Sequence, residues 1–313
     1  MRIVVAVDGS IASDRAYELV ARLNLPEDAQ IRVVAVMNEG PAVGGIDWHA
    51  DLPDAKFGPD GERARLATAL ETAARSLSDA GRQHVDAILL RGDPAQAIID
   101  EAVESKADLI VVGHRGRGAV ASMLLGSTST KVAEHAHCPV LVVREPKMAS
   151  ALLAEDGSES SGEAVEVAAT WPIFDLLPIT VVSVADVALP VTMEVQLGLY
   201  EQVLKSYMES VDLARAQTRT IAMLAAERLN KAGRKANVHV LEGSPATSIV
   251  EAARAHGVDL VVMGTRGHTG LARLALGGTA HSVMLHAPCS VLVVRGLPVA
   301  ATEPRPVDQP AAV

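Results

Sequence analysis

The chain has 313 residues, of which 49% are hydrophobic and 2% aromatic, and its formal net charge is −10. The hydrophobic content excludes wholesale disorder, and the scarcity of aromatic side chains excludes a base-stacking binder of single-stranded nucleic acid. The negative charge opposes the binding of duplex DNA. No apolar run is long enough to cross a bilayer, and two cysteines are too few for a disulfide scaffold. We therefore expect a cytoplasmic protein with neither nucleic-acid nor membrane partners, long enough for two domains.

The first half of the chain alternates between strand and helix patterns. Short runs rich in β-branched residues predict strands at Ile3–Val7, Ile31–Met37, Val85–Leu90, Asp108–Gly113 and Pro139–Val143. Several of these runs are apolar throughout, as expected for strands that helices cover on both faces. Strands separated by helices imply right-handed crossovers and a mainly parallel sheet.

Local signals mark the ends of several helices. Asp93 and Ser244 are good N-cap residues, and in both cases a proline then occupies the first helical position. A stripe of leucines from Leu66 ends at Gly81, and its longer counterpart runs from about Leu199 to Ala232. Between the second strand and this first leucine stripe, residues 38–61 are rich in Gly, Pro and Asp, which predicts a long loop that is either a lid, a contact surface or mobile.

The chain repeats itself. The segment ADLIVVGHRGRG from Ala107 returns as VDLVVMGTRGHTG from Val258, an offset of 151 positions, and the same offset relates the Gly-x-Pro-Ala segments that begin at Gly92 and Gly243. One constant offset across separate segments indicates an internal duplication. We predict an α/β fold of two tandem Rossmann-like domains, each a five-stranded mainly parallel sheet with helices on both faces. The expected ranges are 1–145 and 149–297, joined by a linker at 146–150 and followed by a disordered tail at 298–313.

A glycine pattern follows the fourth strand. Gly113 and Gly116 come first, and nine residues later Gly126 precedes Ser127 and Thr128 at the start of a helical pattern. Glycines allow close approach of backbone N–H groups to an anion, and a helix N-terminus supplies unpaired donors with a favourable dipole. We expect Ser127 to cap this helix and to donate its hydroxyl to a phosphate. Arg115 and Arg117, in the intervening loop, are candidate phosphate partners.

Asp8 follows the first strand, as Gly113 ends the fourth. In a doubly wound sheet, ligands bind beyond the carboxyl ends of the strands at the switch point. A strand order of 3-2-1-4-5 would place Asp8 opposite the glycine pattern. The carboxylate would then hydrogen bond a ribose or help to hold a metal ion.

This arrangement resembles the universal stress protein family, whose nucleotide-binding members carry an early Asp and G-x2-G-x9-G-[S/T] after the fourth strand. The first half matches in full, with Asp8, Gly113, Gly116, Gly126 and Ser127. The resemblance implies two domains of the adenine nucleotide alpha hydrolase-like type that bind ATP with Mg²⁺. It also implies that the backbone at Val36, and at Val184 in the second half, meets the adenine. By the same resemblance, the two halves pair through their last strands and whole chains form a homodimer. We further expect an unknown regulatory protein to be the partner that reads the nucleotide-bound surface.

The second half matches the pattern less well. It retains the aspartate and the glycines, at Asp156, Gly264, Gly267 and Gly277. Gly278 replaces the hydroxyl residue, with Thr279 one position later, and Glu155 replaces the apolar residue before the aspartate. A carboxylate near the adenosine pocket predicts a second site that is weaker, altered or empty.

Other functions remain open at this point. A slow ATPase or adenylate-transferring enzyme, a scaffold with a structural nucleotide, and a binder of AMP or cAMP all fit the same pattern. The chain has no G-x4-G-K-[S/T] P-loop and no G-x-S-x-G nucleophile elbow, and we identify no catalytic residue. His135, His137 and Cys138 suggest a metal site, but we favour a structural reading, since a histidine suits a helix end and a cysteine suits a buried strand.

Overall fold

The computed structural model describes residues 1–38, 59–116, 125–186, 200–265 and 276–295. The first half contains β1 (Arg2–Ala6), α1 (Ile11–Arg22), β2 (Gln30–Met37), α2 (Pro59–Asp79), β3 (His84–Arg91), α3 (Pro94–Glu104), β4 (Leu109–Gly113), α4 (Ser127–His135) and β5 (Val140–Val143). The second half contains β6 (Ala151–Ala154), α5 (Glu159–Thr170), the short 3-10 helix η2 (Pro172–Phe174), β7 (Pro178–Ala185), α6 (Tyr200–Lys231), β8 (Lys235–Glu242), α7 (Pro245–His256), β9 (Leu260–Gly264), α8 (Gly278–His286) and β10 (Ser290–Val294).

All five predicted strands of the first half are confirmed, with shifts of one residue at several ends. The long helix predicted from about Leu199 is confirmed as α6. The loop predicted at 38–61 extends too far, because Pro59 to Gly61 belong to α2; a proline is tolerated in the first turn of a helix. Residues 39–58 of that loop, and the expected tail at 298–313, lie outside the described residues.

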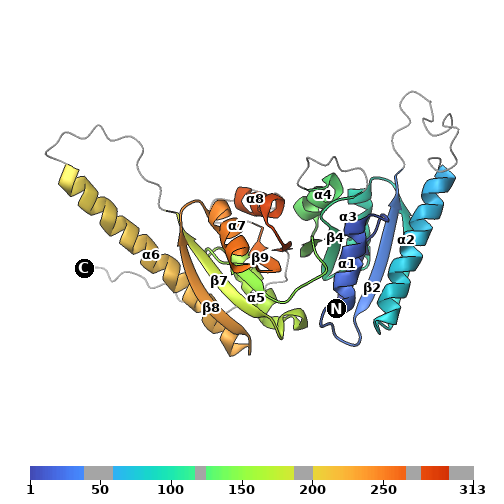
Figure 1. Cartoon of the computed structure of the whole chain (residues 1–313), viewed down its shortest axis with the longest axis horizontal. Coiled ribbons are helices and arrows are strands. Elements are labelled where there is room, and N and C mark those ends of the chain that lie inside the picture. The colour runs from blue at the N-terminus through green and yellow to red at the C-terminus, as the bar shows by residue number, and fades with distance from the viewer. Residues whose placement is uncertain (39–58, 117–124, 187–199, 266–275, 296–313) are drawn as a thin grey trace, which may run out of the picture.

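The strands form one ten-stranded sheet in the order β3-β2-β1-β4-β5-β10-β9-β6-β7-β8. Each half therefore has the order 3-2-1-4-5, the condition under which Asp8 lies opposite the glycine pattern. Neighbouring strands are parallel except β5 and β10, which pair antiparallel with Leu141 opposite Leu292. The expected pairing of the halves through their last strands is confirmed within the chain, so two five-stranded sheets become continuous (Figure 1).

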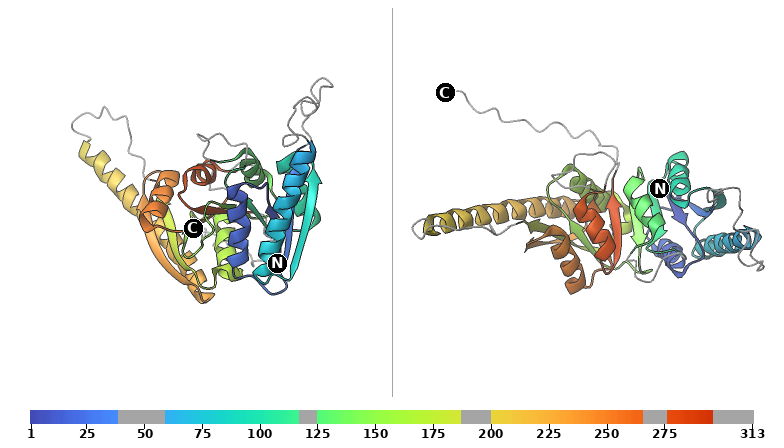
Figure 2. Two further views of the ribbon diagram at one scale, coloured as in Figure 1. Left: turned by 45° about the vertical axis from the view of Figure 1, so that its right-hand side comes forward. Right: turned by 90° about the horizontal axis from the view of Figure 1, so that it is seen from above.

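Helices cover both faces of this sheet, and each face has its own hydrophobic core. One core combines α1, α2, α5 and α6 with side chains such as Ile3 and Val5, while the other combines α3, α4, α7 and α8 with Val4. Both cores run through both halves, which explains why the central strands are fully buried. The helices α2 and α6 lie at opposite ends of the molecule, and α6 projects furthest (Figures 1 and 2).

The connection between the halves is held on both sides. Arg22 of α1 donates to the Pro146 carbonyl at 2.7 Å. Lys147 Nζ lies 3.0 Å from Asp259 Oδ1, and the Ala149 N–H donates to Asp259 Oδ2 at 2.9 Å. This short linker is therefore anchored to both halves. Within the described part of the chain, no helix has the length and apolar content of a membrane span.

Candidate functional site

A cavity of about 370 Å³ lies beyond the carboxyl ends of β1 and β4, within the size range of small-molecule pockets. Its lining residues are Ala6, Val7, Asp8, Ser13, Val34, Val36, Asn38, Glu62, Arg65, Leu66, Pro94, Ile98, Val112, Gly113, Arg115, Gly116, Gly126, Ser127, Thr128 and Ser129. This is the switch point where β1 pairs with both β2 and β4. Every described residue that was predicted for a nucleotide in the first half lines this one cavity.

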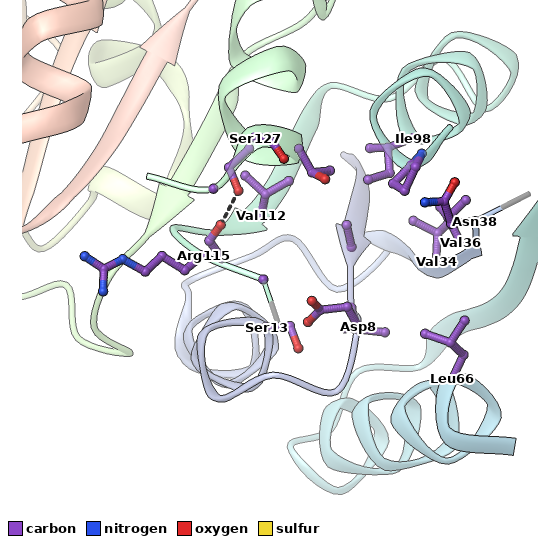
Figure 3. Close-up of a pocket in the computed structure, with 18 of the residues that line it drawn as sticks. Asp8, Ser13, Val34, Val36, Asn38, Leu66, Ile98, Val112, Arg115 and Ser127 are labelled. Carbon is purple, nitrogen blue, oxygen red and sulfur yellow. Dashed lines mark hydrogen bonds between the residues drawn. The ribbon is translucent and has the colours of Figure 1, made fainter. Parts of the chain in front are cut away.

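The cavity has an apolar side and a polar side. Val34, Val36, Leu66 and Ile98 gather on one side in Figure 3. The polar side combines the Asp8 carboxylate with the start of α4. A flat heterocycle suits the first side, and hydroxyl or phosphate oxygens suit the second, since apolar surface excludes water and helix N-termini donate to anions.

Asp8 is held by a tight turn into α1. Its Oδ1 accepts the Ser10 N–H at 3.0 Å, and the Ser10 hydroxyl in turn accepts the Ser13 N–H at 3.2 Å as the N-cap of α1. The turn is completed by Gly9, whose φ of 70° lies in the left-handed region that favours glycine. The sequence VDGS thus fixes the carboxylate at the mouth of the cavity.

The other polar edge is the N-terminus of α4. The N-cap of this helix is Gly126, so the prediction that Ser127 caps it is wrong: Ser127 is the first helical residue. Two bonds fix the start of the helix. The Gly126 N–H donates to the His114 carbonyl at 2.8 Å, and the Ser129 hydroxyl donates to the Gly113 carbonyl at 2.6 Å. The hydroxyl-bearing first turn therefore faces the cavity on a firmly held helix.

The glycines have distinct roles. A Cβ at Gly113 would lie 2.5 Å from the backbone carbonyl carbon and oxygen of Ala12, so this glycine allows α1 to pack against the end of β4. A Cβ at Gly116 would lie 2.7 Å from Asp8 Oδ2, so this glycine makes room for the carboxylate. Gly113 is thus required for packing, whereas Gly116 belongs to the cavity itself.

Two charged lining residues were missed from the sequence. Arg65 of α2 donates from Nη1 to the Asp8 carbonyl at 2.8 Å, and its Nη2 lies 3.6 Å from Glu62 Oε1. Both side chains are partly buried, and they place a paired cation beside the turn that carries Asp8. Both residues come directly after the irregular segment and before the leucine stripe that begins at Leu66. Helical periodicity alone therefore could not predict that they face the cavity.

Arg115 lines the cavity, but its guanidinium points away from Asp8 and from the apolar side of the cavity (Figure 3). Its Nε is buried and has no hydrogen-bond partner among the described residues. A phosphate contact by this side chain would require another rotamer. The other arginine expected there, Arg117, lies outside the described residues.

The second half has a smaller cavity, of about 160 Å³, at the equivalent place. Its lining residues are Ala154, Glu155, Asp156, Ser161, Val182, Val184, Pro245, Ile249, Met263, Gly264, Thr265, Gly277, Gly278, Thr279 and Ala280. These positions correspond to those of the first cavity. The remaining predicted residue, Gly267, lies outside the described residues.

Glu155 changes the second cavity most. The residue is only 7% exposed, and its Oε1 accepts the Gly157 N–H at 2.8 Å and the Ser161 hydroxyl at 2.7 Å. In the first half, Val7 occupies this place, so among the described residues the Ser13 hydroxyl keeps only its contact with the Ser10 carbonyl, which Ser161 also makes with the Ser158 carbonyl. A buried carboxylate therefore joins the polar wall of a cavity that is already small, which disfavours an anionic ligand.

The histidine and cysteine segment has a structural explanation. His135 Nδ1 lies 2.9 Å from the Lys131 carbonyl at the end of α4, and His286 repeats this contact at the end of α8. Burial raises the pKa of the Cys138 thiol to about 12 and that of the Cys289 thiol to about 11. Among the described residues, no group of three or more His, Cys, Asp or Glu side chains is placed to hold a metal ion.

This architecture, a doubly wound α/β unit repeated in tandem with a cavity at each switch point, defines a class of Rossmann-like proteins. The sequence profile of the universal stress protein family matches residues 1–144 and 148–295. The chain therefore belongs to the universal stress protein family, in a tandem form.

Individual relatives agree with this assignment. A universal stress protein of Mycolicibacterium smegmatis is 32% identical over 308 residues, covering 94% of this chain and 96% of that protein. One from Thermus aquaticus is 38% identical over 142 residues, covering 45% of this chain and 97% of its own length. The crystal structure of a universal stress protein from Archaeoglobus fulgidus shares the fold with a TM-score of 0.63, at 20% identity, covering 94% of this chain and 98% of that one.

Proposed function

We propose that the first half binds an adenine nucleotide, ATP in the first place, and that the protein acts as a regulatory stress-response module. The observation that carries this proposal is the single cavity that joins Asp8, an apolar wall and the N-terminus of α4. The adenine would lie against Val34 and Val36, the ribose hydroxyls would bond to Asp8, and the phosphates would meet the Ser127 and Thr128 end of α4.

The described residues fit a magnesium ion bound mainly through the nucleotide. Mg²⁺ keeps several waters and is often held by one or two carboxylates together with phosphate oxygens. Asp8 is the carboxylate at the polar edge of the cavity, and Gly116 leaves space beside its Oδ2. The ion would neutralise phosphate charge next to this aspartate.

A binding role is favoured over hydrolysis. Among the described lining residues the carboxylates are Asp8 and Glu62, and Glu62 lies beside the Arg65 guanidinium. Asp8 accepts the Ser10 N–H, and a role on the ribose or the metal ion leaves it unsuited to activate water. Binding would stabilise the fold by about 2.7 kcal/mol at a hundredfold excess of ATP over its Kd, which is enough to shift a conformational population.

The proposal includes a homodimer and a regulatory protein that reads the ATP-bound state. The two halves already occupy the β5 and β10 edges, so whole chains would associate through another surface. Light scattering with and without Mg-ATP measures the mass of the complex.

Calorimetric titration of ATP, ADP, AMP and cAMP with Mg²⁺, into protein stripped of nucleotide, tests the function. We expect micromolar ATP binding near one site per chain. The variant Gly278→Ser restores the hydroxyl of the first half at a position where a Cβ meets nothing within 4 Å. Because Glu155 remains, we expect this variant to leave the stoichiometry near one, and the double variant Gly278→Ser with Glu155→Val to raise it. No heat with any nucleotide would refute the proposal.

A further inference from the structure

The two helices that begin at the cavities are each held by an arginine of the other half. Arg295 follows β10, and its Nη1 donates to the carbonyl oxygens of Glu134 at 2.7 Å and Ala136 at 3.1 Å. Its Nη2 donates to the Ala133 carbonyl. All three carbonyls belong to the end of α4, in the first half.

The reverse contact repeats this arrangement. Arg144 follows β5, and its Nη2 donates to the carbonyls of Met284 at 3.0 Å and Leu285 at 2.9 Å, at the end of α8. The antiparallel pairing of β5 with β10 makes these reciprocal contacts possible, because it directs each arginine towards the helix of the other half. The helices lie on either side of the junction between the halves (Figure 1).

These contacts meet a physical need of α4. The last carbonyls of a helix have no partner within it, and a cation there complements the helix dipole. At nine residues, α4 is too short to be stable alone in water. Arg295 is only 9% exposed, so its donors are screened little by solvent.

The helix is thus held at its two ends by different halves. At its start, Ser129 bonds to the Gly113 carbonyl of the first half; at its end, Arg295 comes from the second. Glu134 Oε1 also lies 3.4 Å from His281 Nδ1 of α8. Displacement of the C-terminal end would move the N–H groups and hydroxyls that line the cavity, since a helix this short moves as a unit.

We propose that Arg295 is a positioning residue for the first cavity, through which the second half sets the affinity of the first half for phosphate groups. The inference rests on the proposed function, because it treats the start of α4 as the phosphate-binding end. The second half, with its smaller cavity, would then serve as a support for the first site. Arg144 supports α8 in the same way and provides the control; because burial and then the Arg144 charge lower the pKa of His114 beside the first cavity, a smaller loss of ADP affinity is expected in its variant.

The test compares Arg295→Met with Arg144→Met in the full chain. Hydrogen exchange is first measured without ligand over the peptides that contain α4 and α8. Calorimetry then gives the affinities for ADP and for adenosine, which has no phosphate. We expect Arg295→Met to lose protection at 127–135 alone and Arg144→Met at 278–286 alone. We also expect ADP binding about tenfold weaker in Arg295→Met, which is ~1.4 kcal/mol, with adenosine changed less than twofold.

Several results would overturn the inference: unchanged exchange at α4, equal weakening of ADP and adenosine, or an equal loss of ADP affinity in Arg144→Met. Arg295→Lys keeps the charge and tests the same point if the methionine variant fails to fold; it should recover part of the ADP affinity. A wild-type chain that binds no adenine nucleotide refutes the proposed function separately, and a chain that binds ATP but not ADP is tested with ATP in place of ADP. If no adenine nucleotide binds, a loss of protection at α4 alone still supports the claim that Arg295 stabilises this helix. Unchanged hydrogen exchange at α4 would refute that claim.

Discussion

Replacing Gly116 with alanine should weaken ATP binding while leaving the fold intact. The added Cβ would lie 2.7 Å from Asp8 Oδ2, closer than a methyl carbon and an oxygen approach, so the carboxylate must move. Gly116 is exposed and carries no positive φ, so the backbone tolerates the methyl group. A hydrogen bond to a charged group is worth about 1.5–3 kcal/mol, which predicts binding weaker by roughly tenfold to a hundredfold if Asp8 loses its contact with the ribose or the metal ion.

Calorimetry with Mg-ATP measures this loss, and Gly278→Ala is the matched control. A Cβ at Gly278 meets nothing within 4 Å, and the residue lies in the second cavity. The control should therefore bind ATP as the wild type does. Chemical denaturation checks that the free energy of unfolding changes by less than about 0.5 kcal/mol in both variants, as for surface substitutions. Wild-type affinity in Gly116→Ala would show that Asp8 is not part of the binding site.

Three further predictions concern stability and reactivity. Gly113→Ala places a Cβ 2.5 Å from the Ala12 backbone and should destabilise the fold by about 1–3 kcal/mol in urea denaturation; a neutral effect would show that α1 does not pack this closely on β4. Because burial raises the pKa of Cys138 to about 12 and of Cys289 to about 11, both above the ordinary value of 9.0, neither should react with iodoacetamide at pH 8 in the folded protein. Rapid alkylation at pH 8 would contradict the raised pKa of these thiols. The stability that the two protonated thiols contribute is complete below pH 9 and is lost as the pH rises through 11 to 12. Burial, followed by the Arg144 charge, lowers the pKa of His114 below 6.5, so the unfolded chain gains this proton first and stability falls as the pH drops below 6.5. His114→Thr should flatten that part of the stability profile, and an unchanged slope would assign it to another group.

The sequence was sufficient for the topology because its signals are periodic and duplicated. The position of Asp8 opposite the glycine pattern was conditional on the order 3-2-1-4-5, and that order is present in each half, with β1 between β2 and β4. The Asp93 cap is also confirmed, since its Oδ1 accepts the N–H groups of Ala95 and Gln96 at 3.1 Å. The Asp93 cap depends only on residues close together in the sequence.

Side-chain capping was predicted less well. Ser244 occupies the N-cap position of α7 but makes no capping hydrogen bond with its side chain, in contrast to Asp93. A serine hydroxyl rotates among several acceptors and donors, whereas one carboxylate oxygen of Asp93 has lone pairs for both N–H groups. Ser127 similarly lies one position inside the helix that it was expected to cap.

Contacts across the chain were beyond sequence reasoning. Arg65 reaches the Asp8 carbonyl from a helix that begins after a long irregular stretch, and no local pattern aims it there. The sequence shows that β5 and β10 are each followed by an arginine, Arg144 and Arg295. That each arginine binds the end of the helix in the other half depends on the antiparallel pairing of these two strands. Tertiary geometry, rather than residue type, decides such contacts.

The central claim, that an adenine nucleotide binds in the first cavity, is tested most directly by mapping hydrogen exchange with and without Mg-ATP. The account predicts slower exchange at 113–116 and 126–130 when ATP is present, with little change at the equivalent residues 264–265 and 277–281. Protection confined to the second half, or absent from both cavities while ATP is bound, would contradict it.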